Sequence, residues 1–273
     1  MCAKSKQNHK EYPSVIPLVP ILLGGDDVIV ISDGRYSMTF AVEYLRCFEK
    51  FTAEYPILRQ LARAARAQKT GVKNNESMGI SAAAGVAIVK TPFPFYDACR
   101  MASSLCDIAK DKTRDLSAVN FHIHYDASSI DIEAAQEQYA TITARPYIVA
   151  DVVNKDKRLI GWEKVVNAAI EIRGLGKSDG LPRNQQAALR QVLDDDQATA
   201  INRWKLLKLR GYSSTLSALE GEDPAIGPYL WKNNDIYAGS LLLDVMQLND
   251  IIPAEALILD AERKYRGSDI YDN

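Results

Sequence analysis

Two neighbouring aspartates at a glycine-rich turn are the residues of this sequence best suited to chemistry. Asp26 and Asp27 directly follow Gly24 and Gly25, and apolar runs rich in β-branched residues stand on both sides. Glycines allow positive φ in a tight turn and leave space for a ligand, because they have no Cβ atom. Carboxylate oxygens suit Mg²⁺ or Mn²⁺, and such an ion can hold nucleotide phosphates. The pattern predicts a metal site at the tip of a hairpin, although turn chemistry alone would also explain these four residues.

The spacing of apolar residues predicts the elements that position this turn. Runs at residues 15–23 and 28–32 are typical of the two strands of a β-hairpin. Helical periodicity follows over residues 36–51 and again over 57–67. The chain then alternates strand and helix: a strand buried on both faces at 79–89, an amphipathic helix at 95–110, and a half-exposed strand at 119–125.

Several sequence blocks stand in a fixed order between residues 15 and 130. They are PLVP at 17–20, LLGGDDVIV at 22–30, SAAAGVAIV at 81–89, PFY at 94–96, CDIAK at 106–110 and AVNFHIH at 118–124. In this order they resemble the second palm domain of the large, polymerase-like subunit of type III CRISPR effector complexes, and its stand-alone relatives. Beyond residue 130 the resemblance is limited to a helical C-terminal region.

The resemblance implies a ferredoxin-like palm, related to diguanylate cyclases and class III nucleotide cyclases, which join or cyclise nucleoside triphosphates. It implies that Asp26 and Asp27 are the catalytic, metal-binding pair, and that Gly24 and Gly25 admit the nucleotide. Lys110 matches a lysine that contacts the triphosphate, and a lysine is a suitable point charge for phosphate. By its position alone, Lys110 could equally be a solvated residue that complements the dipole at a helix C-terminus.

The chain departs from the family pattern before the hairpin. The family palm begins with a strand that carries a further metal-binding aspartate, followed by one or two helices. Here 23 residues precede Gly24, and the first dozen are polar. We therefore expect a palm that is incomplete at its N-terminus. Three explanations stay open: the chain is a fragment, a companion polypeptide supplies the missing half, or the domain has lost catalysis.

The second half of the sequence is predicted to be helical. The stretches with helical character are residues 133–144, 162–173, 185–193, 197–210 and 236–248, with a Gly/Pro loop at 177–183. The fold prediction is therefore α+β, with a disordered tail at 1–14, a palm-like domain at 15–150 and an all-helical domain at 151–273.

The composition excludes several functional classes. In 273 residues, 33 Lys and Arg stand against 35 Asp and Glu, which gives a net charge of −2. A protein that binds nucleic acid through its overall charge is usually basic, so an RNA contact would need a local patch. No apolar run reaches membrane length, and the first residues lack the apolar core of a signal peptide. We expect a soluble, cytoplasmic protein without membrane contact.

The four cysteines do not form a recognisable site. No C-x-x-C pattern occurs, which argues against a disulfide framework and a zinc knuckle. We expect reduced thiols, and the three that lie on apolar helix faces should pack in the core rather than act as nucleophiles. The four are Cys2, Cys47, Cys99 and Cys106.

Other polar groups keep two interpretations each. His122 and His124 share a strand face and could bind a metal with a third ligand, or belong to a solvated or packed face. Residues 32–35 are a turn or a base or ribose contact, and residues 194–196 (Asp-Asp-Asp) begin a helix or bind a metal. A basic cluster in the helical half is a solvated face or contacts RNA or a partner subunit; it comprises Arg183, Arg190, Arg203, Lys205, Lys208 and Arg210, with Trp204 between them.

Two functions follow as predictions. The first is a nucleotide-binding palm that is part of a Mg²⁺- or Mn²⁺-dependent nucleotidyltransferase, which makes cyclic oligonucleotide second messengers from ATP in antiviral defence. Its partners would be ATP or another nucleoside triphosphate, and a polypeptide that supplies the rest of the palm or a second palm. The alternative is a non-catalytic palm that acts as a structural or sensor subunit and binds a partner chain.

Overall fold

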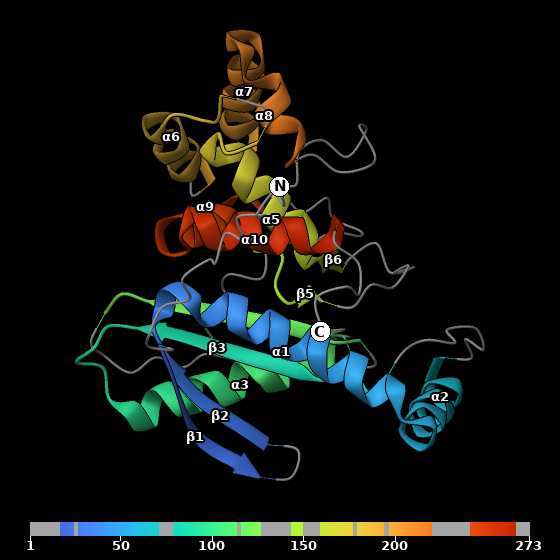
Figure 1. Ribbon diagram of the computed structural model, residues 1–273. Coiled ribbons are helices and arrows are strands. Elements are labelled where there is room, and N and C mark those ends of the chain that lie inside the picture. The colour runs from blue at the N-terminus through green and yellow to red at the C-terminus, as the bar shows by residue number, and fades with distance from the viewer. Residues whose placement is uncertain are drawn as a thin grey trace, which may run out of the picture.

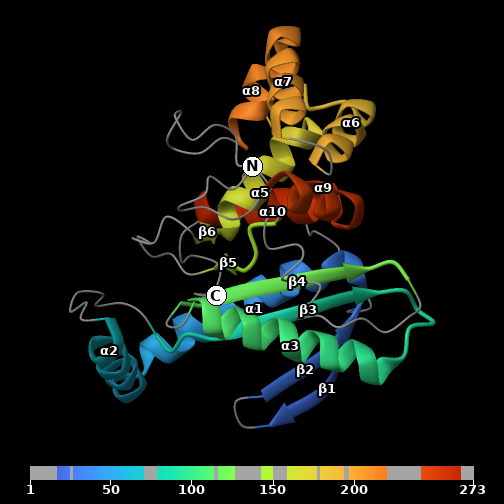
Figure 2. The same ribbon diagram turned by 180° about the vertical axis from the view of Figure 1, so that it is seen from behind.

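The computed structural model has an α+β architecture with two separate sheets. It describes residues 17–24, 27–70, 79–113, 116–126, 143–149, 159–176, 179–193, 197–219 and 241–265. The larger sheet is covered by helices on both sides, and a two-stranded hairpin lies beside the helix on one of these sides (Figure 1). The view from behind shows the same layers, with the C-terminal helices stacked on the side opposite the hairpin (Figure 2).

The predicted hairpin is present. β1 (Leu18–Gly24) and β2 (Asp27–Ser32) pair in antiparallel register, with Gly24 opposite Asp27. β-branched side chains favour this extended conformation, and the glycine-rich turn reverses the chain within two residues. A shift in register lies between Pro20 and Leu22, because proline cannot donate a ladder hydrogen bond.

The larger sheet has the strand order β3-β4-β5-β6. β3 and β4 are parallel and joined by α3, β4 and β5 are antiparallel, and β5 and β6 are parallel. The bounds are Ala83–Val89 for β3, Ala118–His124 for β4, Tyr147–Ile148 for β5 and Ile160–Gly161 for β6. One sheet that joins the hairpin to β3 and β4, as the palm expectation requires, is therefore not formed by the described ranges. The physical reason is that no described strand forms hydrogen bonds with both the hairpin and β3.

Two helices follow the hairpin and a third connects β3 to β4. α1 (Gly34–Glu54) and α2 (Pro56–Thr70) extend the helices predicted at 36–51 and 57–67. α3 (Phe95–Thr113) confirms the predicted amphipathic helix and continues three residues beyond Lys110. The Asp33 carboxylate caps α1 by accepting a hydrogen bond from the Arg35 amide at 2.9 Å, so residues 32–35 are the end of β2 and the start of the helix rather than a separate turn.

Strand β4 is more buried than its alternating sequence indicates. All seven of its residues are buried, so the expectation of a half-exposed strand is wrong. Its apolar residues Val119, Phe121 and Ile123 belong to the main core. The alternate residues lie under α3, where the Asn120 amide donates to the Leu105 carbonyl at 3.2 Å. Alternation of polar and apolar residues does not distinguish water from a packed helix as the environment of the polar face.

The C-terminal half is mainly helical, as predicted. Its helices are α5 (Trp162–Arg173), α6 (Arg183–Leu193), α7 (Gln197–Leu207), the π-helical turn η1 (Lys208–Tyr212), α8 (Ser213–Ser217), α9 (Leu241–Ile251) and α10 (Ala254–Tyr265). Helix α10 was not predicted, and β6 shows that the region after residue 150 is not entirely helical. Most of the helix predicted at 133–144, and residues 1–14, 177–178, 194–196 and 236–240, lie outside the described residues.

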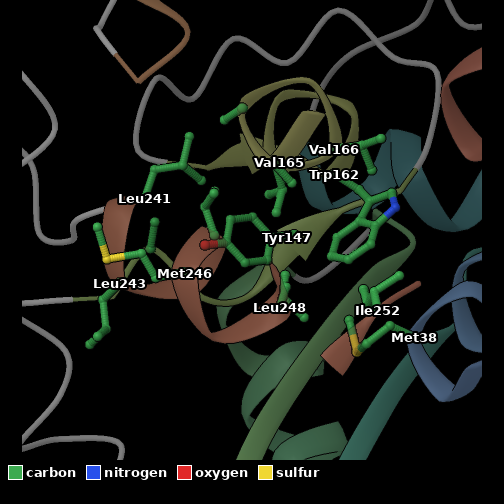
Figure 3. Packing of buried hydrophobic residues seen from close by; sticks show 14 of the residues in the cluster. Met38, Tyr147, Trp162, Val165, Val166, Leu241, Leu243, Met246, Leu248 and Ile252 are labelled. Carbon is green, nitrogen blue, oxygen red and sulfur yellow. The ribbon is translucent and has the colours of Figure 1, made fainter. Parts of the chain in front are cut away.

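One buried core connects the sheet to the helical half. Tyr147 of β5 and Trp162 of α5 meet edge to face with ring centroids 6.2 Å apart, and Leu248 of α9 packs beside them (Figure 3). Met38 of α1 and Ile252 belong to the same cluster. Burying each such side chain contributes about 1.5–3 kcal/mol. Within the described ranges, no helix has the length and apolar character needed to cross a membrane.

Candidate functional site

The predicted site lies at the tip of the hairpin. Gly24 and Asp27 are paired and exposed, and the two residues that connect them, Gly25 and Asp26, lie outside the described residues. A Cβ at Gly24 would meet only a Leu22 methyl carbon, at 3.9 Å. Gly24 belongs to an extended strand and does not have the positive φ that we expected. The open space expected beside it is present. The tip is accessible to a ligand.

The hairpin lies beside α3, the helix that carries Cys106 and Lys110. Cys106 is half-buried on α3, and its thiol contacts the Ala83 carbonyl at 3.3 Å. Burial raises the pKa of the Cys106 thiol; the charge of Lys110 lowers this pKa, and the charges of Asp107 and Asp27 raise it. Asp27 of β2 and Lys110 of α3 therefore act on this thiol with opposite charges. Figures 1 and 2 agree in showing the hairpin beside α3.

Lys110 keeps both of its predicted interpretations. It stands in the last turn of α3, where a cation complements the helix dipole. Its ammonium lies 3.8 Å from the Asp107 carboxylate, and both side chains are largely exposed, at 60% and 71%. An exposed pair at this distance is weak, so Lys110 can turn toward an anionic ligand at little cost.

Gly85 sets the position of α3, and sequence analysis gave it no role. A Cβ at Gly85 would lie 2.0 Å from the Ala102 carbonyl oxygen and 2.5 Å from the Cys106 amide nitrogen. Real Cβ contacts are never so short, so only glycine lets α3 pack this closely against β3. The side chains of Cys106 and Lys110 depend on this approach for their distance from the hairpin.

The donor set at the hairpin suits a hard cation but is small. Asp27 contributes carboxylate oxygens, and the neighbouring Asp26 would add a second pair. Among the residues that the structure describes, no group of three or more His, Cys, Asp or Glu side chains is placed to hold a metal. Asp26 and Asp27 fit Mg²⁺ or Mn²⁺ in chemistry, and further oxygens would have to come from a nucleotide, water or another chain.

The two strand histidines form a packed face. His122 and His124 are buried, their ring centroids lie 6.0 Å apart, and Phe93 meets His124 edge to face. Burial lowers the pKa of His122 to about 4, and the positive charge of Arg145 and the neighbouring His124 contribute. His122 is therefore neutral at pH 7. The packed interpretation of this face is the one that the structure shows.

A buried ion pair joins the sheet to α9 and was not predicted. The Arg145 guanidinium lies 2.7 Å from the Asp244 carboxylate, and both side chains are almost fully buried. The Tyr147 hydroxyl also donates to Asp244, and the guanidinium stacks on the Phe121 ring at 3.7 Å. Burial raises the pKa of Asp244, and Arg145 opposes this shift. The only sequence signal was an aspartate within the apolar run of α9.

The basic cluster of the helical half is partly structural. Trp204 is buried, so its ring is not a stacking surface. Arg203 donates to the Gln185 side chain at 2.8 Å. Lys205 and Arg210 are exposed, as a solvated face would be. The contact with RNA or a partner subunit stays a prediction for these exposed positions.

Comparison with known proteins adds no family to this geometry. No protein-family model matches the sequence, and no curated protein is significantly similar to it.

Proposed function

We propose that this chain is the nucleotide-binding part of a palm, and that it acts in a metal-dependent nucleotidyltransferase that makes cyclic oligonucleotide messengers from ATP in antiviral defence. The observation that carries the proposal is that the hairpin, with Asp27 exposed where β2 begins, lies beside α3, which carries the exposed Lys110. A metal–triphosphate complex needs a carboxylate that binds the metal cation and a positive side chain that binds the phosphate. Asp27 and Lys110 have these two charges.

Each residue has a stated role in this proposal. Mg²⁺ or Mn²⁺ at Asp26 and Asp27 would neutralise the triphosphate and polarise the ribose 3′-hydroxyl that displaces pyrophosphate. Lys110 binds a triphosphate oxygen as a point charge. Gly24 keeps the tip open, since the nearest atom to an added Cβ is 3.9 Å away. Phosphoryl transfer depends mainly on positioning and charge neutralisation, and these residues could contribute both.

The proposal includes a companion polypeptide that supplies a further palm strand. Apolar side chains of the hairpin are exposed in cross-strand pairs, including Ile29 opposite Leu22 and Ile31 opposite Val19. β3 pairs with β4 on one edge, and no other described strand occupies its second edge. Unpaired strand edges and exposed apolar surface favour addition of a strand from another chain. That strand would join the two sheets and could bring a third carboxylate.

The alternative is a non-catalytic palm that serves as a structural or sensor subunit. The specific observation in its favour is that the hairpin forms a sheet of its own, with no described third acidic ligand beside Asp27. In that case the exposed hairpin binds the partner chain, and nucleotide turnover is absent.

Labelled ATP with Mn²⁺ separates the two functions. The full chain is incubated alone and with the product of its neighbouring gene, and oligonucleotide products are resolved by chromatography. We expect a product that is lost in Asp27→Asn and in Asp26→Asn, and reduced at least about tenfold in Lys110→Gln. The matched control is Asp126→Asn, which removes an exposed carboxylate at the end of β4, away from the proposed site.

Two results would reject the catalytic proposal. One is the absence of both product and calorimetric ATP binding with the partner present. The other is a product that persists in Asp27→Asn. Hydrogen exchange on the same mixture tests the strand proposal, because amides of β2 and β3 should gain protection when a partner strand pairs with them. Protection gained without product would select the structural alternative.

A further inference from the structure

Two surfaces at opposite ends of α1 are left uncovered by the residues that the structure describes. The first is the α2 ridge, defined as Ile57 and Leu61, which are 73% and 58% exposed and stand one turn apart. Ala62, the next residue after Leu61, is buried. The apolar face of α2 is therefore buried at Ala62 and exposed at the ridge. The α2 ridge exposes two neighbouring apolar side chains that continue the buried face of the helix. Contiguous apolar surface of this kind often marks an interaction site.

The charges around the α2 ridge have one sign. Helix α2 carries no acidic residue, and its charged residues are all basic. The two whose side chains the structure describes are Arg59 and Arg63. A surface that matches this ridge should therefore combine an apolar depression with a negative rim.

The second surface is the α1–α10 pocket, a depression of about 320 Å³. Tyr36 and Thr39 of α1 form one wall, and Ala256 and Leu259 of α10 form the other. Tyr36 and Leu259 are 39% and 46% exposed, so aliphatic and aromatic surface is open to water inside it. The volume is sufficient for one or two aliphatic side chains.

The rim of the α1–α10 pocket is negative. Asp260 also lines the pocket, but its carboxylate is already bound by Arg46 at 2.5 Å and by the Trp162 indole at 2.6 Å. Glu255 is exposed at the rim. The nearby Arg173 feels its charge but donates its hydrogen bonds to the Asn249 and Ile252 carbonyls, so the Glu255 carboxylate stays open to an incoming cation. Arg35, near Tyr36, is engaged by the Asp33 carboxylate at 2.7 Å.

The ridge and the pocket of one chain cannot meet each other. α1 spans 21 residues between them, which is about 30 Å of helix. Figures 1 and 2 show α2 beyond the C-terminal end of α1 and away from α10. A contact between the two surfaces therefore requires two copies of the chain.

We infer that the occupant of the α1–α10 pocket is the α2 ridge of a second copy of this chain. Ile57 and Leu61 fill the pocket between Tyr36 and Leu259, and basic residues of α2 meet Glu255. The contact is head-to-tail, so each copy offers one ridge and one pocket. It is smaller than a standard interface, so the association is weak and grows with concentration. The inference uses neither the hairpin nor Lys110 and is independent of the proposed nucleotide chemistry.

Sedimentation of the full chain over a range of concentrations tests this contact. We expect the mean mass of the wild type to rise with concentration. Leu61→Glu, which removes the ridge, and Glu255→Lys, which reverses the rim, should each weaken association about tenfold or more. Leu209→Glu is the matched control, because Leu209 is 85% exposed on the distant turn η1; it should associate like the wild type.

Mixing the two defective variants gives the sharpest outcome. The Leu61→Glu chain keeps its pocket and the Glu255→Lys chain keeps its ridge, so an equal mixture should form a species of two copies and no larger one. Ile57→Glu and Leu259→Arg replace either variant that circular dichroism shows to be unfolded. The inference is overturned if the wild type stays monomeric, if the mixture does not associate, or if Leu209→Glu is equally defective. Association that persists in both variants would assign it to another surface, such as the hairpin.

Discussion

At the scale of single residues, burial decides what a polar side chain can do. His122 and Asp244 are both almost fully buried, but only Asp244 has a counter-charge, from Arg145 at 2.7 Å. His122 is held neutral because burial and the same Arg145 disfavour its protonated form. Asp27, in contrast, is exposed at a strand end, where a cation can reach it.

The lowered pKa of His122 makes stability depend on pH. The pKa of His122 is about 4 in the folded chain and ordinarily 6.5. Between these two pH values the unfolded chain therefore binds a proton at His122 that the folded chain does not bind. The stabilising contribution is complete above pH 6.5 and is lost as the pH falls toward 4. Between pH 7 and pH 5 the wild type should lose about 2 kcal/mol more than His122→Gln. Urea unfolding of both proteins at the two pH values measures this; equal losses would contradict it.

At the scale of elements, close packing of α3 on β3 positions the candidate site. Gly85 permits this contact, and the hairpin lies beside α3. The elements themselves follow local rules: Asp33 caps α1, and Pro92 and Pro94 precede the start of α3. Their mutual distance is set by a glycine that no local rule singles out.

The replacement Gly85→Ala tests this packing. The added methyl carbon would lie 2.0 Å from the Ala102 carbonyl oxygen, so α3 must move away from β3. We expect a loss of about 3 kcal/mol in the free energy of unfolding. Gly24→Ala is the control, because its added carbon meets nothing closer than 3.9 Å, and it should change stability by less than about 0.5 kcal/mol. Equal effects in denaturant titrations would show that Gly85 is not a packing constraint.

At the scale of the whole molecule, the two halves share one core. Met38 of α1, Tyr147 of β5 and Leu248 of α9 belong to the same buried cluster. Asp260 of α10 adds a polar connection, since it binds Arg46 of α1 and Trp162 of α5. A helical domain that folded apart from the sheet would have to leave these groups unpartnered.

A shared core should make unfolding cooperative. We expect the urea transitions followed by far-ultraviolet circular dichroism and by tryptophan fluorescence to coincide, because Trp162 and Trp204 report on the helical half while circular dichroism reports on the whole chain. Two separated transitions would instead support independent domains that divide near residue 150.

Local sequence determined much of the secondary structure. The hairpin, α1, α2, β3, α3, β4, α5, α6 and α7 all follow from apolar periodicity and turn residues, because hydrophobic spacing and chain reversal act over a few residues. The candidate residues Gly24 and Asp27 could also be predicted at the hairpin tip, and Lys110 near the end of its helix. The nucleotide chemistry assigned to them stays a prediction.

Only the tertiary structure decided which of these elements meet. The burial of His122 and His124, the ion pair between Arg145 and Asp244, and the separation of the hairpin from the larger sheet depend on residues far apart in the chain. Packing energies of that kind are sums over contacts between distant segments, so no local pattern contains them. The position of the hairpin beside α3 is of the same origin, because the two elements are separated by more than sixty residues of the chain.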